Sequence, residues 1–253
     1  MTFRVVIPAR LGSTRLPDKP LADLGGKPMI VRVAERAQLS RAQEVIVATD
    51  AQSIMDACSR HNIRAIMTLD THPSGTDRIA EVARTLRFPD ASVVVNVQGD
   101  EPLIDPELIN STADRISGTT LMATAACHID SIDELFNPNI VKVVLDKEGR
   151  ALYFSRAPVP WDRAGFSEVP GQMSPEYAAL RHIGIYAYRN DFLLRYPSLS
   201  VSPVEAFEAL EQLRALWHGV AISVHMAASA PVAGVDTPED LDRVRQYFMQ
   251  NNR

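Results

Sequence analysis

Three cationic side chains stand close together in a loop that follows a short apolar run near the start of the chain. The run is Phe3–Ile7, and the cations are Arg10, Arg15 and Lys19. The β-branched run predicts a strand, and the small residues after it predict a loop at the strand's carboxyl end. Ligands of open α/β sheets bind at that end, and clustered cations suit a polyphosphate. The alternative interpretation is an ordinary basic loop without a ligand.

This loop matches neither of the two common phosphate-binding signatures. A P-loop needs G-x-x-x-x-G-K-[ST], whereas Gly26 and Lys27 are followed by Pro28 and lack the upstream glycine. The dinucleotide fingerprint G-x-G-x-x-G and the nucleophile elbow G-x-S-x-G are also absent. Covalent catalysis is unsupported, because neither cysteine has an obvious base beside it.

Two acidic segments far apart in the sequence carry candidate metal ligands. Asp100 follows the apolar run 93–97, which is typical of the central strand of a parallel sheet. Gly99 beside it lets the backbone approach a ligand closely. Asp236 precedes the last predicted helix, which Asp236 or Thr237 could cap. A phosphate-bound Mg²⁺ takes few protein carboxylates, so the pair predicts a magnesium site; a solvated turn and a helix cap are the alternatives.

A third polar segment lies at the predicted start of a helix near residue 76. Ser74 and Thr76 offer hydroxyl groups, Gly75 permits close backbone contact, and Arg78 adds a cation. A helix N-terminus with exposed N–H groups is suited to a phosphate or to the polar edge of a base. The simpler interpretation, a capped helix start, is compatible with this role.

Bulk composition excludes several classes of protein. The chain has 253 residues, 46% of them hydrophobic and 23% charged, and a formal net charge of −5, which is ordinary for a soluble globular protein. An acidic chain is not expected to bind polymeric nucleic acid. No run is apolar enough to span a bilayer, and Pro8 and Arg10 interrupt any signal peptide. Cys58 and Cys127 are read as reduced thiols of a cytoplasmic protein.

Strand and helix signals alternate in the first part of the chain, and the pattern changes after about residue 118. The alternation predicts a doubly wound, mostly parallel α/β sheet. The expected early strands are 3–7, 45–48, 65–67 and 93–97, and the expected early helices begin near Pro28, before Ile54, near Thr76 and at Asp105–Glu107.

Strands dominate the later part. They are expected at 121–127, 141–145, 152–155, 183–188 and 222–224, with a turn at 147–149, a long loop at 157–176, a helix over 204–213 and a last helix from Pro238. We therefore expect one domain over 1–253 with a strand-rich insert at about 120–190.

Eight segments in order resemble the CMP-Kdo synthetase family, the 3-deoxy-manno-octulosonate cytidylyltransferases. They span nearly the whole chain: 7–21, 74–78, 96–102, 137–139, 153–156, 181–186, 210–214 and 234–240. The resemblance implies a Rossmann-like nucleotidyltransferase fold and the reaction of CTP with Kdo to give CMP-Kdo and pyrophosphate, for lipopolysaccharide inner-core synthesis. It also implies a cytoplasmic homodimer, with the 120–190 insert forming much of the interface.

The resemblance also assigns roles to residues of this sequence. Lys19, Asp100 and Asp236 match catalytic positions, and the two aspartates match the family's Mg²⁺ ligands. The nucleotide-binding positions are Ala9, Arg10, Ser13, Arg15, Lys19, Ser74, Gly75 and Arg78. The sugar-binding positions are Gln98, Arg156, His182, Tyr186 and Glu211. Among these, Arg156 and His182 are expected to meet the Kdo carboxylate through charge-assisted hydrogen bonds.

Two other functions compete with this one. A cytidylyltransferase for a related sugar acid, 8-amino-Kdo or sialic acid, would have similar motifs, although Ser13–Arg15 and Lys19–Pro20 stand where sialic-acid enzymes typically carry Ser-Lys and Lys-Asn. A catalytically silent nucleotide-binding regulator would be expected to lack Lys19, Asp100 or Asp236, and all three are present. One departure from the family is Asp18, where many relatives carry glycine.

Overall fold

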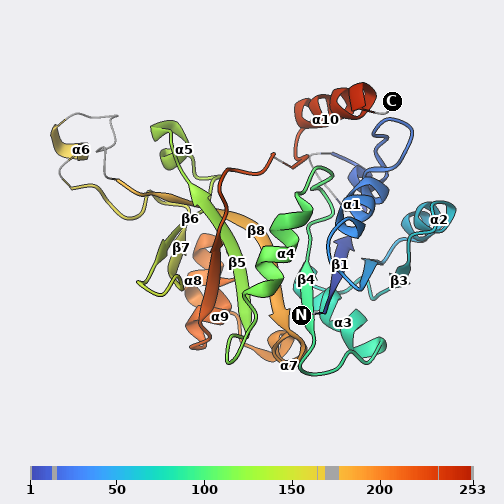
Figure 1. The fold of residues 1–253 in the computed structure, drawn as a ribbon, viewed down its shortest axis with the longest axis horizontal. Helices are drawn as coiled ribbons and strands as arrows, with labels where there is room; N and C mark the ends of the chain where they lie inside the picture. Colours follow the sequence, from blue (N-terminus) through green and yellow to red (C-terminus); the bar gives the residue numbers. More distant parts are fainter. Residues whose placement is uncertain (1, 13–15, 164, 169–176, 233, 252–253) are drawn as a thin grey trace.

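The computed structural model describes residues 2–12, 16–163, 165–168, 177–232 and 234–251. Within these residues, strands form one mixed sheet covered by helices (Figure 1). The strands are β1 (Phe3–Ala9), β2 (Glu44–Thr49), β3 (Ala65–Met67), β4 (Val93–Asn96), β5 (Met122–His128), β6 (Lys142–Leu145), β7 (Ala151–Ser155), β8 (Leu180–Arg189) and β9 (Ile222–Met226).

The helices alternate with the early strands and become shorter later in the chain. They are α1 (Met29–Gln38), α2 (Gln52–Arg60), α3 (Gly75–Thr85), α4 (Pro106–Asp114), α5 (Ile132–Phe136), α6 (Gly165–Glu168), α7 (Asn190–Arg195), α8 (Pro203–Glu208), α9 (Leu213–Trp217) and α10 (Pro238–Asn251). Two 3₁₀ turns lie at Lys19–Leu21 and Tyr196–Ser198. No helix among the described residues has the length and apolar character needed to cross a bilayer.

The first half of the sheet is parallel, as the alternating pattern predicts. β1 pairs with β2 and β4, and β2 pairs with β3, all in parallel. Val5 and Ile7 of β1 belong to the same apolar core as α1, whereas Val6 packs with α3 on the opposite face. Both faces of the strands are therefore buried, which is why their sequences are continuous apolar runs. The carboxyl ends of β1 and β4 lie side by side and carry the candidate site.

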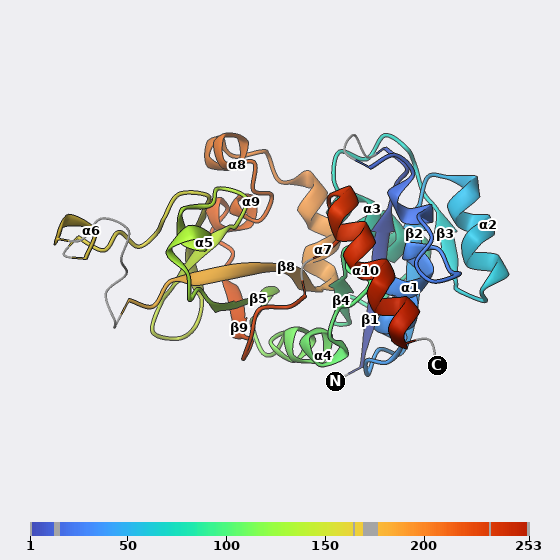
Figure 2. The same cartoon turned by 90° about the horizontal axis from the view of Figure 1, so that it is seen from above.

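The second half of the sheet is mixed. β8 lies between β4 and β5 and is antiparallel to both, while β9 pairs with β5 in parallel. The insert predicted at 120–190 thus contributes β5 and β8 to the central sheet, and β6 and β7 extend beside β8. In Figure 1 and Figure 2 the insert extends away from α2, and α6 lies at its far end.

The later helices differ from the expectation. The helix predicted over 204–213 is two helices, α8 and α9, because Ala209 takes a left-handed conformation with φ 50°. The short helices α5, α6 and α7 were not predicted, since four to six residues are too few to show a helical period. The predicted cap at Asp105 is confirmed: its side chain accepts a hydrogen bond from the Glu107 N–H.

Candidate active site

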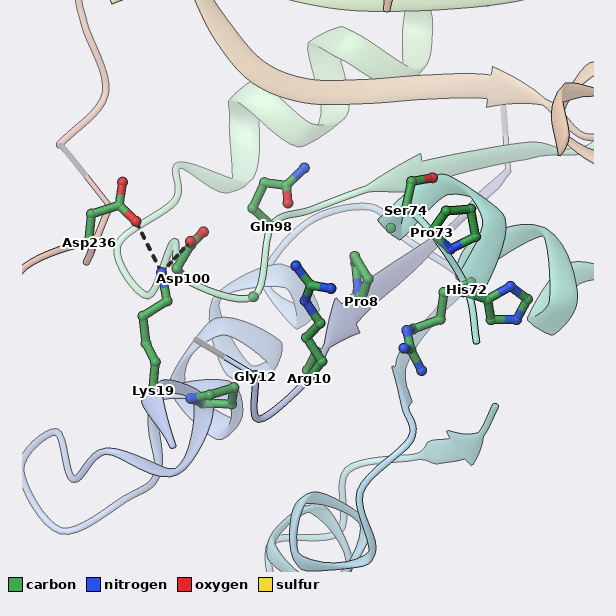
Figure 3. A pocket seen from close by; sticks show the side chains of 15 residues that line it. Pro8, Arg10, Gly12, Lys19, His72, Pro73, Ser74, Gln98, Asp100 and Asp236 are labelled. Carbon is green, nitrogen blue, oxygen red and sulfur yellow. Dashed lines mark hydrogen bonds and ion pairs between the residues drawn. The ribbon is translucent and has the colours of Figure 1, made fainter. Parts of the chain in front are cut away.

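Three side chains from distant segments meet beside the loop after β1. The Nζ atom of Lys19 lies 2.7 Å from Oδ2 of Asp100 and 3.2 Å from Oδ1 of Asp236 (Figure 3). It also donates a hydrogen bond to the carbonyl oxygen of Val235 at 2.8 Å. One ammonium group is therefore surrounded by three oxygen atoms. The structure brings together the three residues that the sequence marks as catalytic.

Backbone contacts fix the two carboxylates. A Cβ atom on Gly99 would lie 2.8 Å from the carbonyl oxygen of Pro8, so glycine is required where the turn after β4 crosses the end of β1. The close approach expected at Gly99 is thus to the protein's own backbone. On the other side, the Val235 N–H donates to the carbonyl of Asp100 at 2.9 Å, and Val235 is fully buried.

Hydrogen bonds at the start of α10 show that Thr237, and not Asp236, caps this helix. Thr237 Oγ1 accepts from the Asp240 N–H at 3.2 Å. The Asp240 carboxylate accepts in return from the N–H groups of Asp236 and Thr237, each at 3.1 Å. This is a reciprocal capping arrangement, and it leaves the Asp236 side chain on Lys19. The cap and the candidate metal ligand are therefore neighbouring residues with separate roles.

Electrostatics reinforce the cluster. Burial lowers the pKa of Lys19, but the two aspartates outweigh it, so its pKa is raised and the ammonium stays charged. Next to Asp100, burial and the neighbouring carboxylate raise the pKa of Glu101 to about 8. Glu101 is tightly packed, because a Cβ on Gly234 would lie 2.9 Å from its Oε1. With this raised pKa, Glu101 is mostly neutral near pH 7, and the carboxylates of Asp100 and Asp236 are the groups that favour a cation at the cluster.

A cavity of about 410 Å³ opens beside Lys19 and extends to the start of α3. Most of its walls are polar side chains and backbone from the ends of β1 and β4 and from the segment before α3. Predicted site residues that line it are Ala9, Arg10, Lys19, Ser74, Gly75, Arg78, Gln98, Asp100 and Asp236. Ser13 and Arg15 lie outside the described residues.

The start of α3 is a helix cap that also faces this cavity. Ser74 Oγ accepts from the Asp77 N–H at 3.2 Å and lies 3.0 Å from Oε1 of Glu211. Gly75 fits against Pro8, whose Cγ would lie 3.2 Å from an added Cβ. Arg78 is buried and bonded to Thr68 and Asp50. Its guanidinium therefore forms part of the wall with its charge already paired.

His72 is a cavity residue to which the sequence analysis gave no role. It lines the wall near Ser74 and pairs with Glu81 on α3, which also accepts from the Leu69 N–H at 3.0 Å. Burial would raise the pKa of Glu81, but these contacts outweigh it and lower the pKa. Its position just before Ser74 could have indicated that His72 lies at the site. The histidine by itself gives no such indication.

A second cavity of about 230 Å³ lies on the other side of Asp100 and Asp236. His182 lines it and bonds Thr124 Oγ1 at 2.9 Å. Burial lowers the pKa of His182 to about 3, so its ring is neutral near pH 7; the charge-assisted bond expected to the Kdo carboxylate stays a prediction. Arg181, which the sequence analysis did not single out, supplies a cation to this wall and pairs with Glu134 at 3.3 Å.

Three predicted sugar-binding residues line neither cavity. The guanidinium of Arg156 donates to the carbonyl oxygens of Glu208 at 2.7 Å and of Pro138 at 2.9 Å. Tyr186 lies beside His182, with ring centroids 5.5 Å apart. Glu211 is joined to the main cavity through Ser74.

The comparisons with known proteins agree with one another. A model of the cytidylyltransferase family matches residues 4–222. Over 250 residues, 99% of this chain and 100% of the relative, the sequence is 66% identical to a Herminiimonas arsenicoxydans protein named 3-deoxy-manno-octulosonate cytidylyltransferase. A CMP:2-keto-3-deoxy-manno-octonic acid synthetase complexed with CTP has a similar structure, with TM-score 0.89 and 41% identity over 98% of both chains.

A more distant likeness concerns the fold alone. A cytidylyltransferase from Leptospira borgpetersenii shares 14% identity at a TM-score of 0.57, over 99% of this chain and 94% of that one. The family match begins in β1 and ends at the first residue of β9, so it includes the Lys19 loop and the Asp100 turn. The sequence, the sheet and the comparisons lead to one conclusion: this chain belongs to the cytidylyltransferase family.

Proposed function

We propose that this protein joins CTP to Kdo, releasing pyrophosphate, and thereby activates the sugar acid for lipopolysaccharide inner-core synthesis. The observation that carries the proposal is the meeting of Lys19, Asp100 and Asp236 beside the larger cavity. Relatives at 66% and 41% identity whose names give this activity support the choice of nucleotide and sugar.

The larger cavity is the proposed CTP site. Ala9, Ser74 and Gly75 form a wall of small residues whose hydroxyl and backbone groups suit the polar edge of a cytosine. Arg10 and Lys19 lie toward the other end, where they would meet the triphosphate, together with the proposed contributions of Ser13 and Arg15. Arg78 would shape the base pocket rather than neutralise phosphate, because Asp50 already pairs with it at 2.5 Å.

Asp100 and Asp236 are the proposed Mg²⁺ ligands. The donor set fits, because three oxygen atoms already surround a cation there. Among the described residues no group of three or more histidine, cysteine or acidic side chains forms a metal cage. Mg²⁺ takes one or two protein carboxylates and completes its shell with phosphates and water. When bound, the ion would neutralise phosphate charge and activate the attacking oxygen.

Transfer of this kind depends on positioning and on neutralising charge. The anomeric hydroxyl of Kdo attacks the α-phosphorus of CTP in line, and pyrophosphate leaves. Lys19 would release the two carboxylates and turn to the phosphates. Gln98 and His182, which line the two cavities, would orient the sugar through neutral hydrogen bonds. Arg156 would meet the Kdo carboxylate through its guanidinium, which carries five N–H donors and also bonds the carbonyl oxygens of Glu208 and Pro138.

We also propose that the protein is a homodimer acting in the cytoplasm, where CTP is available. Large apolar side chains are exposed on β7, α8 and α9: Leu152 is 59% exposed, Phe207 92% and Trp217 57%. Exposed apolar groups of this size are typical of protein interfaces. Sedimentation of the wild type and of Phe207→Glu tests this, and a wild-type monomer would contradict it.

The activity is tested by pyrophosphate release from a panel of nucleoside triphosphates and sugar acids. We expect turnover with CTP and Kdo, and little with ATP or GTP. Equal turnover with ATP would contradict the base assignment. A preference for 8-amino-Kdo or sialic acid would identify the related transferase instead. CTP binding without turnover on any sugar acid would indicate a silent regulator.

A further inference from the structure

Glu208, the last residue of α8, joins this helix to the end of β7, beside the predicted sugar-binding residue Arg156. Its carboxylate accepts from Ser155 Oγ at 2.6 Å and from the Arg156 N–H at 2.9 Å, both at the end of β7. Its own carbonyl accepts from Arg156 Nε at 2.7 Å. The end of β7 and the end of α8 are therefore joined by two bonds between the same two residues, in both of which Arg156 donates and Glu208 accepts.

The charge of this carboxylate acts on a buried cation, Lys142. Lys142 is completely buried, and its Nζ donates only to carbonyl oxygens among the described residues, those of Asn137, Ile140 and Arg156. Burial lowers the pKa of Lys142, and the charge of Glu208 opposes that shift. Arg156 likewise has carbonyl partners at Pro138 and Glu208. Glu208 is an anion whose charge favours the charged form of Lys142, since a buried charge without compensation is costly.

The segment that follows Glu208 leads directly to the proposed site. Ala209 turns the chain in a left-handed conformation, with φ 50°, and the Glu211 carboxylate then lies 3.0 Å from Ser74 Oγ at the start of α3. The Glu211 carbonyl accepts from the Tyr196 hydroxyl at 2.8 Å. A shift at Glu208 would move the start of this short turn, whereas the bond to Ser74 holds the Glu211 end of the turn at the nucleotide cavity wall.

We infer that Glu208 is a positioning residue: its carboxylate fixes the end of β7, from which the Arg156 side chain starts, and the turn that leads to Glu211, and so shapes the sugar side of the site. The inference rests on the proposed function. Glu208 lines neither of the two cavities, so it acts through Arg156 and Glu211. Among the described residues, the hydrogen bonds that its carboxylate accepts come from the end of β7 and the residue after it, not from β1, β4 or α3.

The test is the effect of Glu208→Gln on the two Michaelis constants, with Glu148→Gln as the matched control. Glu148 sits at the other end of the β6–β7 hairpin in an exposed pair with Arg150. We expect Glu208→Gln to raise the KM for Kdo at least about tenfold while the KM for CTP changes less than twofold. The control should change neither. A loss of folded protein alone would lower the apparent kcat and leave both KM values unchanged.

Ser155→Ala keeps the inference testable if Glu208→Gln does not fold. It removes one bond to the carboxylate and no charge, so we expect a rise of about threefold in the KM for Kdo alone. The double variant should be less than additive, because both changes break one contact. Equal changes in both KM values, or none in Ser155→Ala, would overturn the inference. A wild type that turns over no Kdo would instead refute the proposed function.

Discussion

The two sides of the site are built in different ways. The nucleotide side consists of loops at the carboxyl ends of β1 and β4, and its charged groups meet at the surface: the side chains of Asp100 and Asp236 are 33% and 53% exposed. The opposite side consists of β7, β8 and the turn after α8, where His182 is neutral and Arg156 is bonded to backbone carbonyls. Charge is available on one side and largely compensated on the other.

This difference has a consequence for function. On the nucleotide side, a ligand can exchange contacts with Lys19 at small structural cost, because the loop and the carboxylates are held by separate backbone bonds. On the sugar side, carbonyl oxygens of two other segments hold the Arg156 guanidinium in place, so affinity depends on a network rather than on one residue. Substitutions should therefore affect turnover on the first side, and sugar affinity or stability on the second.

The largest expected effect is the loss of either aspartate. Asp100→Asn and Asp236→Asn should each lower kcat at least about a hundredfold, a barrier change of roughly 2.7 kcal/mol. The double variant should be far from additive, because both carboxylates act on one group. Asp242→Asn, on the exposed side of α10, is the control. Near wild-type turnover of Asp236→Asn at limiting Mg²⁺ would leave that segment as a helix start only.

Removing the Lys19 ammonium should lower turnover and raise metal affinity. Its ammonium now bonds the same oxygens that we assign to the metal. Lys19→Met should therefore abolish most turnover and yet raise the affinity for Mn²⁺ or Mg²⁺, measured by calorimetry without nucleotide, about tenfold, since a competing cation is removed. Lys27→Met, which breaks the pair with Glu35 elsewhere, should leave metal affinity unchanged. Weaker metal binding in Lys19→Met would show that the ammonium organises the site instead.

The sequence predicted the nucleotide side of the site better than the sugar side. Apolar runs followed by polar loops predicted β1, β4 and their carboxyl-end turns, because a buried parallel strand leaves that pattern in sequence. The meeting of Lys19 with Asp100 and Asp236 followed from the sheet topology together with the family resemblance. Local signals placed each residue within a few positions of a strand or helix end, and the resemblance assigned the three to one site.

The sugar side was less predictable. Nothing local indicates that β8 runs antiparallel between β4 and β5, or that Ala209 divides one predicted helix into two. The charge state of His182 depends on burial by Phe154 and Tyr186, which pack against its ring from other parts of the sheet. The partners of Arg156 are backbone carbonyls, which no sequence pattern identifies. Tertiary contacts decide these features.

The neutral His182 predicts a pH dependence of stability. Burial holds its pKa at about 3 in the folded state, against 6.5 for an ordinary histidine. Below pH 6.5 the unfolded chain takes up a proton that the folded chain refuses, so this contribution to stability is present above pH 6.5 and is lost as the pH falls toward 3. Between pH 7 and 5 the wild type should lose about 1–2 kcal/mol through this group.

Denaturant unfolding of His182→Asn measures that contribution. The variant should show a smaller loss of unfolding free energy between pH 7 and 5 than the wild type, and exposed His128→Asn should behave like the wild type. The pH profile of turnover should lack an inflection from His182 between pH 5 and 8. An identical pH dependence in wild type and His182→Asn would mean that the ring takes up its proton at the same pH in the folded and the unfolded chain.

The smallest expected effect separates the two roles at the start of α10. Thr237 caps the helix through the Asp240 N–H, whereas the Asp236 carboxylate contacts Lys19. Thr237→Ala should therefore lower the free energy of unfolding by about 1 kcal/mol, the usual loss for a cap of this kind, with a modest change in kcat. Asp236→Asn should show the reverse, an unfolding free energy close to that of the wild type and a large loss of turnover. Matched urea titrations and kinetics on both variants decide the matter. If Asp236→Asn loses as much stability as Thr237→Ala, the Asp236 carboxylate stabilises the start of α10. The separation of a charged group that acts on the nucleotide side from a helix cap that positions it would then be wrong for this residue.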